Sequence, residues 1–180
     1  MNQFNNLLAV GATNRNLGKT EFICRLLQRF IEHEIIAIKI KSIYPDDKKF
    51  HGKDLDPDTN YLIRKENPVF GLDDSKRFLS AGAKSVYYIK SKIEHLGVAI
   101  REVISEYSAS QLFIAESNSV MQYFTPGGFL MIKGPNPDDY KPSSLKFMDQ
   151  SDMIIYSNGK VFDIMPEKVN IRINNNTWEI

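Results

Sequence analysis

The chain has 180 residues, of which 42% are apolar and 25% charged, and its formal net charge is +1. This length and composition predict one soluble globular domain, 1–180, that is large enough to bury a core, and the single cysteine, Cys24, excludes an intrachain disulfide framework. The near-neutral charge gives no electrostatic reason to expect nucleic acid or a membrane surface as a partner.

The chain opens with a polar stretch, 1–6, followed by a predicted buried strand, Leu7–Val10. The opening stretch lacks the basic start and the apolar core of a secretory signal. No later segment approaches the roughly 18 consecutive apolar residues of a membrane span. We therefore expect a cytoplasmic protein.

A phosphate-binding loop is predicted after this strand. The loop ends in Gly18-Lys19-Thr20, and a helical pattern begins at once. Loop amides and the helix dipole favour an anion at such a helix N-terminus. Lys19 is expected to reach the β- and γ-phosphates, the Thr20 hydroxyl to bind Mg²⁺, and Gly18 to let the backbone approach the phosphate closely. The candidate nucleotide-binding residues of this segment are Asn16, Gly18, Lys19, Thr20 and Glu21.

The match to the P-loop pattern G-x-x-x-x-G-K-[ST] is incomplete. Thr13 occupies the place of the first glycine, and the nearest upstream glycine is Gly11. The alternative interpretation is an ordinary strand-to-helix turn with a surface lysine. Arg15, inside the loop, is either a further phosphate contact or a solvated side chain.

A second buried strand, Ile35–Ile40, ends near Lys39 and Lys41. Ligands bind beyond the carboxyl ends of strands in open α/β sheets, so each lysine either faces the site or is exposed at the strand end. The polar segment 44–72 suits a substrate loop or lid. Its acidic residues, with spacing unlike that of an EF-hand, are interpreted as a solvated loop.

The next predicted elements are a short helix from Asp74 or Ser75 to Leu79, a strand at 86–89 and a helix at 92–108. A buried strand at 111–116 then ends in Glu116. A carboxylate at this strand end, opposite a P-loop, is where a group that orients Mg²⁺ belongs. The residues that follow, 117–119, either bind a substrate or cap a turn.

The remaining segments predict a strand after Gly127-Gly128, a short helix at 144–148 and a strand at 152–156. Asn158 either contacts a nucleotide base or is a turn residue. A strand pair is expected within 160–180. The alternation of strands and helices predicts an α/β, P-loop NTPase-like fold: a mostly parallel β-sheet flanked by helices, with a small C-terminal β addition.

Four of these segments together resemble MobB, the molybdopterin-guanine dinucleotide biosynthesis protein B family. The family has an N-terminal P-loop, a second strand ending in lysine, a D-S-x-R-x-x-x-A-G-A pattern and a strand ending in an acidic residue. Gly18-Lys19-Thr20, Lys39, DSKRFLSAGA at 74–83 and Glu116 match them in order, and Gly52-Lys53-Asp54 is similar to the family's G-K-D.

The resemblance implies a GTP- and Mg²⁺-binding accessory protein of molybdenum cofactor assembly, with weak or no GTPase activity, molybdopterin as a second ligand and a homodimeric state. Lys19 and Glu116 would act on the phosphates and Mg²⁺, and Lys39 and Arg77 would contact the nucleotide or the second ligand.

Two other functions stay open. One is an ATP-dependent small-molecule kinase or ligase on the same scaffold, with Asp54, Asp74 or Glu116 activating an acceptor hydroxyl. The other is a binding module that has lost its nucleotide site, for which Thr13 and the glycine-poor loop are the evidence.

Overall fold

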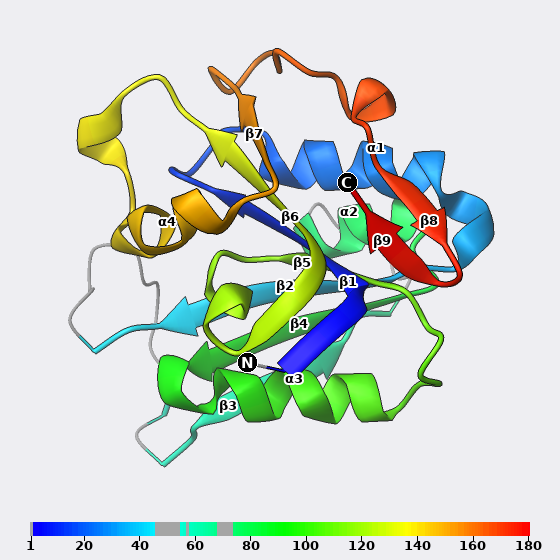
Figure 1. The fold of residues 1–180 in the computed structure, drawn as a ribbon. Coiled ribbons are helices and arrows are strands. Elements are labelled where there is room, and N and C mark those ends of the chain that lie inside the picture. The colour runs from blue at the N-terminus through cyan, green and yellow to red at the C-terminus, as the bar shows by residue number, and fades with distance from the viewer. Residues whose placement is uncertain (1, 46–54, 57, 68–73) are drawn as a thin grey trace.

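In the computed structural model, which describes residues 2–45, 55–56, 58–67 and 74–180, seven strands form one sheet (Figure 1). Their order is β3-β4-β2-β5-β1-β6-β7, and every neighbouring pair is parallel except β3 with β4. The strands are β1 (Asn2–Ala12), β2 (Ile36–Ile43), β3 (Tyr61–Lys65), β4 (Ser85–Lys92), β5 (Phe113–Glu116), β6 (Phe124–Lys133) and β7 (Met153–Tyr156). The predicted α/β class with a mostly parallel sheet is confirmed.

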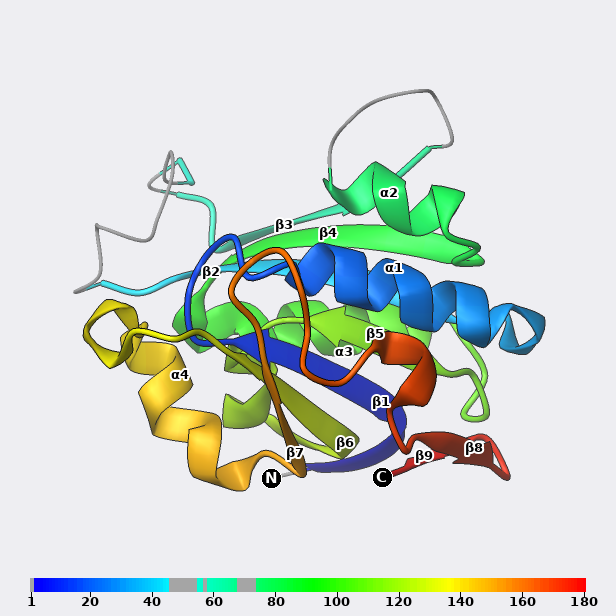
Figure 2. The same ribbon diagram turned by 90° about the horizontal axis from the view of Figure 1, so that it is seen from above.

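Helices cover both faces of the sheet, and Figures 1 and 2 show α1 and α3 on opposite sides of it. Successive side chains of a strand point to opposite faces, so Leu8 and Val10 of β1 pack with α1 while Leu7 and Ala9 pack with α3. The helices are α1 (Lys19–Arg29), α2 (Asp74–Ser80), α3 (Leu96–Ser105) and α4 (Pro142–Phe147). Because both faces are covered, the central strands are apolar throughout, which is the pattern that the sequence showed.

The segment 44–72 is not simply a loop. Tyr61–Lys65 forms β3, which pairs antiparallel with β4 at the sheet edge. An edge strand is half exposed, and β3 includes Arg64 and Lys65, so its apolar pattern is weak. The predictions for Asp54 and for Gly52-Lys53-Asp54 lie outside the described residues.

The strand after Gly127-Gly128 begins earlier than predicted. Both glycines lie inside β6, because β1 and β6 shift register between Phe4 and Leu8 and the two backbones come close there. A Cβ at Gly127 would lie 2.1 Å from the carbonyl oxygen of Asn5. Glycine at this position therefore serves close strand contact and not a turn.

The C-terminal β addition is a hairpin of β8 (Arg172–Asn174) and β9 (Thr177–Glu179). Its turn residues Asn175 and Asn176 have positive φ, as asparagine tolerates. Trp178 is buried, and its indole N–H lies 3.2 Å from the Asn6 carbonyl oxygen and 3.1 Å from that of Phe113. The predicted strand pair is confirmed, although it occupies only the end of 160–180. None of the helices in the described residues is both long and apolar enough to cross a membrane.

Candidate functional site

The predicted phosphate loop connects β1 to α1 at the carboxyl edge of the sheet and forms one wall of a cavity of about 460 Å³. The cavity collects residues from separate parts of the chain. They are Asn14, Arg15, Asn16, Leu17, Gly18, Lys19, Thr20, Glu21, Arg77, Glu116, Lys141 and Gly159. Lys39 does not line this cavity, whereas the other residues assigned to the site by the loop motif and the resemblance do: Asn16, Gly18, Lys19, Thr20, Glu21, Arg77 and Glu116.

Lys39 contacts the site through Glu116. In the parallel pairing of β2 with β5, Lys39 lies directly beside Glu116, so both side chains leave the sheet on the α1 side. The Lys39 ammonium lies 3.3 Å from Oε2 of Glu116. The structure thus supports the interpretation in which Lys39 faces the site.

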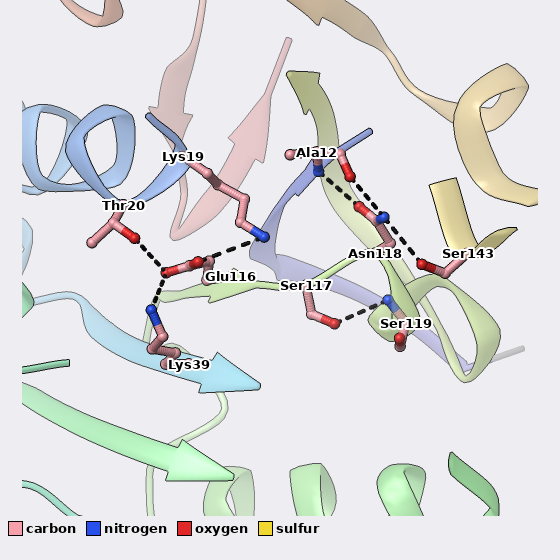
Figure 3. Close-up of polar contacts among 9 residues, drawn as sticks. All are labelled: Ala12, Lys19, Thr20, Lys39, Glu116, Ser117, Asn118, Ser119 and Ser143. Carbon is pink, nitrogen blue, oxygen red and sulfur yellow. Dashed lines mark hydrogen bonds and ion pairs between the residues drawn. The ribbon is translucent and has the colours of Figure 1, made fainter. Parts of the chain in front are cut away.

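The Glu116 carboxylate is the centre of the polar contacts (Figure 3). Its Oε1 lies 3.5 Å from the Lys19 ammonium, and its Oε2 accepts a hydrogen bond of 3.3 Å from the Thr20 hydroxyl. The Glu116 side chain is only 9% exposed, and burying a carboxylate without partners is costly. Lys19 and Lys39 compensate its charge, so one carboxylate joins the end of β5, the middle of β2 and the start of α1.

Thr20 and Glu116 are the residues here that suit a magnesium ion. Both offer oxygen atoms, which Mg²⁺ prefers, and a site with few protein ligands leaves positions for water and phosphate. Within the described part of the chain, no group of three or more His, Cys, Asp or Glu side chains is arranged to hold a metal.

Thr13, which replaces the first glycine of the motif, is fully buried and structural. Its hydroxyl accepts a hydrogen bond of 2.9 Å from the Gly134 N–H and donates to Oδ1 of Asn14. Its carbonyl oxygen accepts from the Lys141 N–H at 2.8 Å. The threonine therefore ties the start of the loop to the segment after β6, a role that glycine has no side chain to perform.

Asn118 holds the end of β1 on the side where β5 has already ended. Its Oδ1 accepts from the Ala12 N–H at 2.8 Å and its Nδ2 donates to the Ala12 carbonyl at 3.0 Å, so the amide continues the ladder of β5 (Figure 3). A Cβ at Gly11 would lie 2.1 Å from Oδ1 of Asn118. Gly11 therefore makes room for this amide and does not serve the phosphate loop directly.

The turn after β7 supports the loop from the other side. Ser157 donates a hydrogen bond of 2.9 Å to the Leu17 carbonyl, and a Cβ at Gly159 would lie 2.7 Å from the Asn16 carbonyl oxygen. Gly18 has φ +80°, and the nearest atom to an added Cβ is in the ring of Phe162, at 3.0 Å. Backbone conformation and this ring contact thus require glycine at 18.

Asn158, which the sequence offered as a contact to a nucleotide base, is a turn residue. Its Oδ1 accepts hydrogen bonds from the backbone N–H groups of Lys160 and Val161, at 3.0 and 3.1 Å. These bonds occupy its side-chain oxygen within the turn.

Arg77 and Glu21 form an ion pair between α2 and α1 at the rim of the cavity. Both side chains are about half exposed, so the pair contributes little to stability. The pair brings the D-S-x-R segment beside the phosphate loop, and the Arg77 guanidinium lies at the mouth of the cavity.

Sequence reasoning missed Lys141 and Gly159 as cavity residues. Lys141 precedes α4 in a proline-rich segment, and Gly159 lies in the turn after β7. Neither has a local motif, and only the strand order, which places β6 beside β1 and β7 beside β6, brings them to the loop.

No protein-family model and no curated protein matches this chain. Among solved structures, it is similar to "apo" LpxK from Aquifex aeolicus, a structure described as a complex with ATP, with a TM-score of 0.49 and 15% sequence identity. The similar region covers 86% of this chain and 49% of LpxK, so the chain spans about half the length of that protein.

Proposed function

We propose that the protein binds a nucleoside triphosphate, GTP, with its phosphates on the loop from Thr13 to Thr20. The observation that carries the proposal is the contact of Glu116 with both Lys19 and Thr20 at the N-terminus of α1. A P-loop site needs at least a lysine that contacts phosphate and oxygen ligands for Mg²⁺ at a helix N-terminus, and these residues supply both.

Each residue of this site has a separate role. Lys19 turns from the Glu116 carboxylate to the phosphates, while the Thr20 hydroxyl and Glu116 hold Mg²⁺, either directly or through its water molecules. Lys39 remains beside Glu116 and balances its charge, and Arg77 contacts the nucleotide from the rim. The cavity volume of about 460 Å³ lies within the usual range for small-molecule sites, roughly 300–1,000 Å³.

The biological role that we propose is that of a MobB-like accessory protein in molybdenum cofactor assembly. This role, the choice of GTP, molybdopterin as the second ligand and a homodimeric state all rest on the sequence resemblance. The proposal is supported by the place of two residues from the resembling segments: Arg77 lies at the rim of the cavity, and Lys39 lies beside its central carboxylate.

A kinase or ligase that uses ATP is the second candidate, and one observation favours it. A smaller cavity adjoins the first and shares Arg15, Lys19 and Lys141 with it. An acceptor molecule needs such a place beside the terminal phosphate. Of the bases considered for this chemistry, Asp54 and the Asp74 side chain lie outside the described residues, and Glu116 contacts two lysines.

Calorimetric titration of GTP and ATP, each with Mg²⁺, tests the proposal. We expect GTP to bind in preference to ATP, and Lys19→Ala to weaken binding at least about tenfold, because a charge-assisted contact to phosphate is lost. Lys84→Ala is the matched control, since Lys84 also pairs with a glutamate but lies just before β4, at the opposite edge of the sheet.

Preference for ATP, with turnover that needs an added acceptor, would favour the kinase or ligase. If neither nucleotide binds, or if both lysine variants bind like the wild type, the proposed site is wrong and the binding-module hypothesis gains support.

A further inference from the structure

The smaller cavity has a volume of about 140 Å³ and lies beyond the carboxyl ends of β2 and β5, next to the phosphate loop. Its residues come from the loop, from both strand ends and from the start of α4. They are Arg15, Lys19, Ile40, Lys41, Ser42, Tyr44, Ser117, Asn118, Ser119, Lys141 and Ser143.

Hydrogen bonds between its own residues hold the walls of this cavity in place. The Tyr44 hydroxyl lies 2.8 Å from Oγ of Ser119, which joins the end of β2 to the turn after β5. Oγ of Ser117 accepts from the Ser119 N–H at 3.0 Å, and Nδ2 of Asn118 donates to Oγ of Ser143 at 3.4 Å (Figure 3). Ser117 and Ser119 therefore cap a turn, and the same turn forms the cavity wall.

The charged side chains that line this cavity are all positive. Arg15, Lys19, Lys41 and Lys141 are cationic, and the described residues that line it include no carboxylate. Glu116 contacts Lys19 from the side of the larger cavity. A positively charged, partly enclosed cavity favours an anionic ligand.

Ser42 gives a second, independent indication of a ligand. Among the buried side-chain nitrogen and oxygen atoms in the described part of the chain, the Oγ of Ser42 is the one without a hydrogen-bond partner. A buried hydroxyl without a partner is unfavourable, and native proteins satisfy such groups in the great majority of cases. Ser42 lines the cavity, so rotation of its side chain toward a ligand oxygen there would give the hydroxyl its missing partner.

The volume limits what can bind. A cavity of about 140 Å³ is close to the roughly 150 Å³ of an apolar cavity that holds one benzene molecule. A nucleotide or a pterin does not fit within it, whereas one phosphate or carboxylate group with a few carbon atoms and hydroxyls does.

We propose that this cavity binds the anionic end of a small hydroxylated molecule, a phosphomonoester or a carboxylate, as a ligand in addition to the nucleotide and the pterin. Its place beside the terminal phosphate of a bound nucleotide rests on the proposed function, whereas anion binding itself rests on Ser42 and the four cations. Arg15, Lys19 and Lys141 line both cavities, so the two ligands would be neighbours.

The test uses three probes of similar size: glycerol 3-phosphate, glycerate and, as the uncharged control, glycerol. Each is titrated by calorimetry into the free protein and into protein loaded with Mg²⁺ and a non-hydrolysable GTP analogue. Ser42→Ala and Lys41→Gln change the smaller cavity alone, and Thr20→Ala changes the larger cavity alone.

We expect one or both anions to bind and glycerol not to bind, and the anion that binds identifies the ligand as a phosphomonoester or a carboxylate. Ser42→Ala should weaken anion binding by about tenfold and Lys41→Gln by about threefold, with unchanged affinity for the nucleotide analogue. Thr20→Ala should weaken the analogue and leave anion binding as in the wild type.

The proposal fails if neither anion binds, if the analogue prevents anion binding, or if Thr20→Ala weakens anion binding as much as Ser42→Ala does. Loss of nucleotide binding is a separate result. If the analogue does not bind while an anion still binds through Ser42 and Lys41, the proposed function is wrong and the anion site stands.

Discussion

Removing the side chain of Asn118 should destabilise the whole domain, because its amide continues the β5 ladder at the end of β1. Asn118→Ala removes the hydrogen bonds of 2.8 and 3.0 Å to the Ala12 backbone. Ala12 is 1% exposed, so its N–H and carbonyl groups would be left buried without these partners. Two lost bonds and the desolvated groups together predict a loss of about 2–4 kcal/mol in the free energy of unfolding.

Gly11→Ala should cost a similar amount through the same residue. The new Cβ would lie 2.1 Å from Oδ1 of Asn118 and 3.0 Å from the ring of Phe129, so the amide must leave its place. The double variant, Gly11→Ala with Asn118→Ala, should then be little less stable than Asn118→Ala alone, which corresponds to a coupling energy of about 2 kcal/mol or more.

Urea denaturation of the wild type, the two single variants and the double variant measures this coupling. Asn136→Ala is a matched control, since the Asn136 side chain is exposed and its bonds to the Asp138 N–H and the Asp139 carboxylate stay within its own turn. This control should cost about 1 kcal/mol or less. Additivity of the two single changes within about 0.5 kcal/mol would show that Gly11 and Asn118 act independently, and the reasoning would be refuted.

Three further predictions concern the site and the C-terminal segment. Glu116→Gln keeps the size of the side chain but removes its charge, so Mg²⁺ should no longer strengthen nucleotide binding; titrations with Mg²⁺ and with a chelator measure this, and an unchanged Mg²⁺ effect would contradict it. Arg29→Ala should lower the free energy of unfolding by about 2–4 kcal/mol, because Arg29 donates hydrogen bonds to the carbonyl groups of Pro166, Val169 and Ile171. Arg29→Lys should lie between this variant and the wild type. Urea denaturation measures the three stabilities, and equal values would contradict the prediction. The pKa of Glu167 is lowered by a hydrogen bond from its own backbone N–H and by the Arg25 guanidinium, so the Arg25–Glu167 contact stabilises the fold above the ordinary glutamate pKa and is lost as the pH falls through the lowered value. Between about pH 7 and pH 3 the melting temperature should therefore fall less in Arg25→Gln than in the wild type, and parallel curves would contradict this.

The central strands could be predicted from the sequence because their burial leaves a plain signal. Leu7–Val10 and the residues before Glu116 are continuously apolar, as strands covered on both faces must be, and the GKT tripeptide fixes where the first helix starts. Glu116 could be assigned to the site because the carboxyl ends of parallel strands meet at one edge.

The edge strand and the supports of the loop could not be predicted in the same way. Charged residues are common in exposed edge strands, and β3 contains Arg64 and Lys65, so its pattern resembles that of a loop. At Thr13 the sequence alone shows only a departure from the motif, because the bond to Gly134 that gives this residue its role depends on β6 lying beside β1. Contacts of this kind follow from the strand order, which no local pattern specifies.

The most direct test of the central claim is a crystal structure of the protein with Mg²⁺ and a non-hydrolysable GTP analogue. The account predicts phosphate density over the loop from Asn16 to Thr20, with the Lys19 ammonium on phosphate and Mg²⁺ near Thr20 and Glu116. Phosphates bound elsewhere, or a Lys19 side chain that stays on Glu116 with nucleotide present, would contradict it.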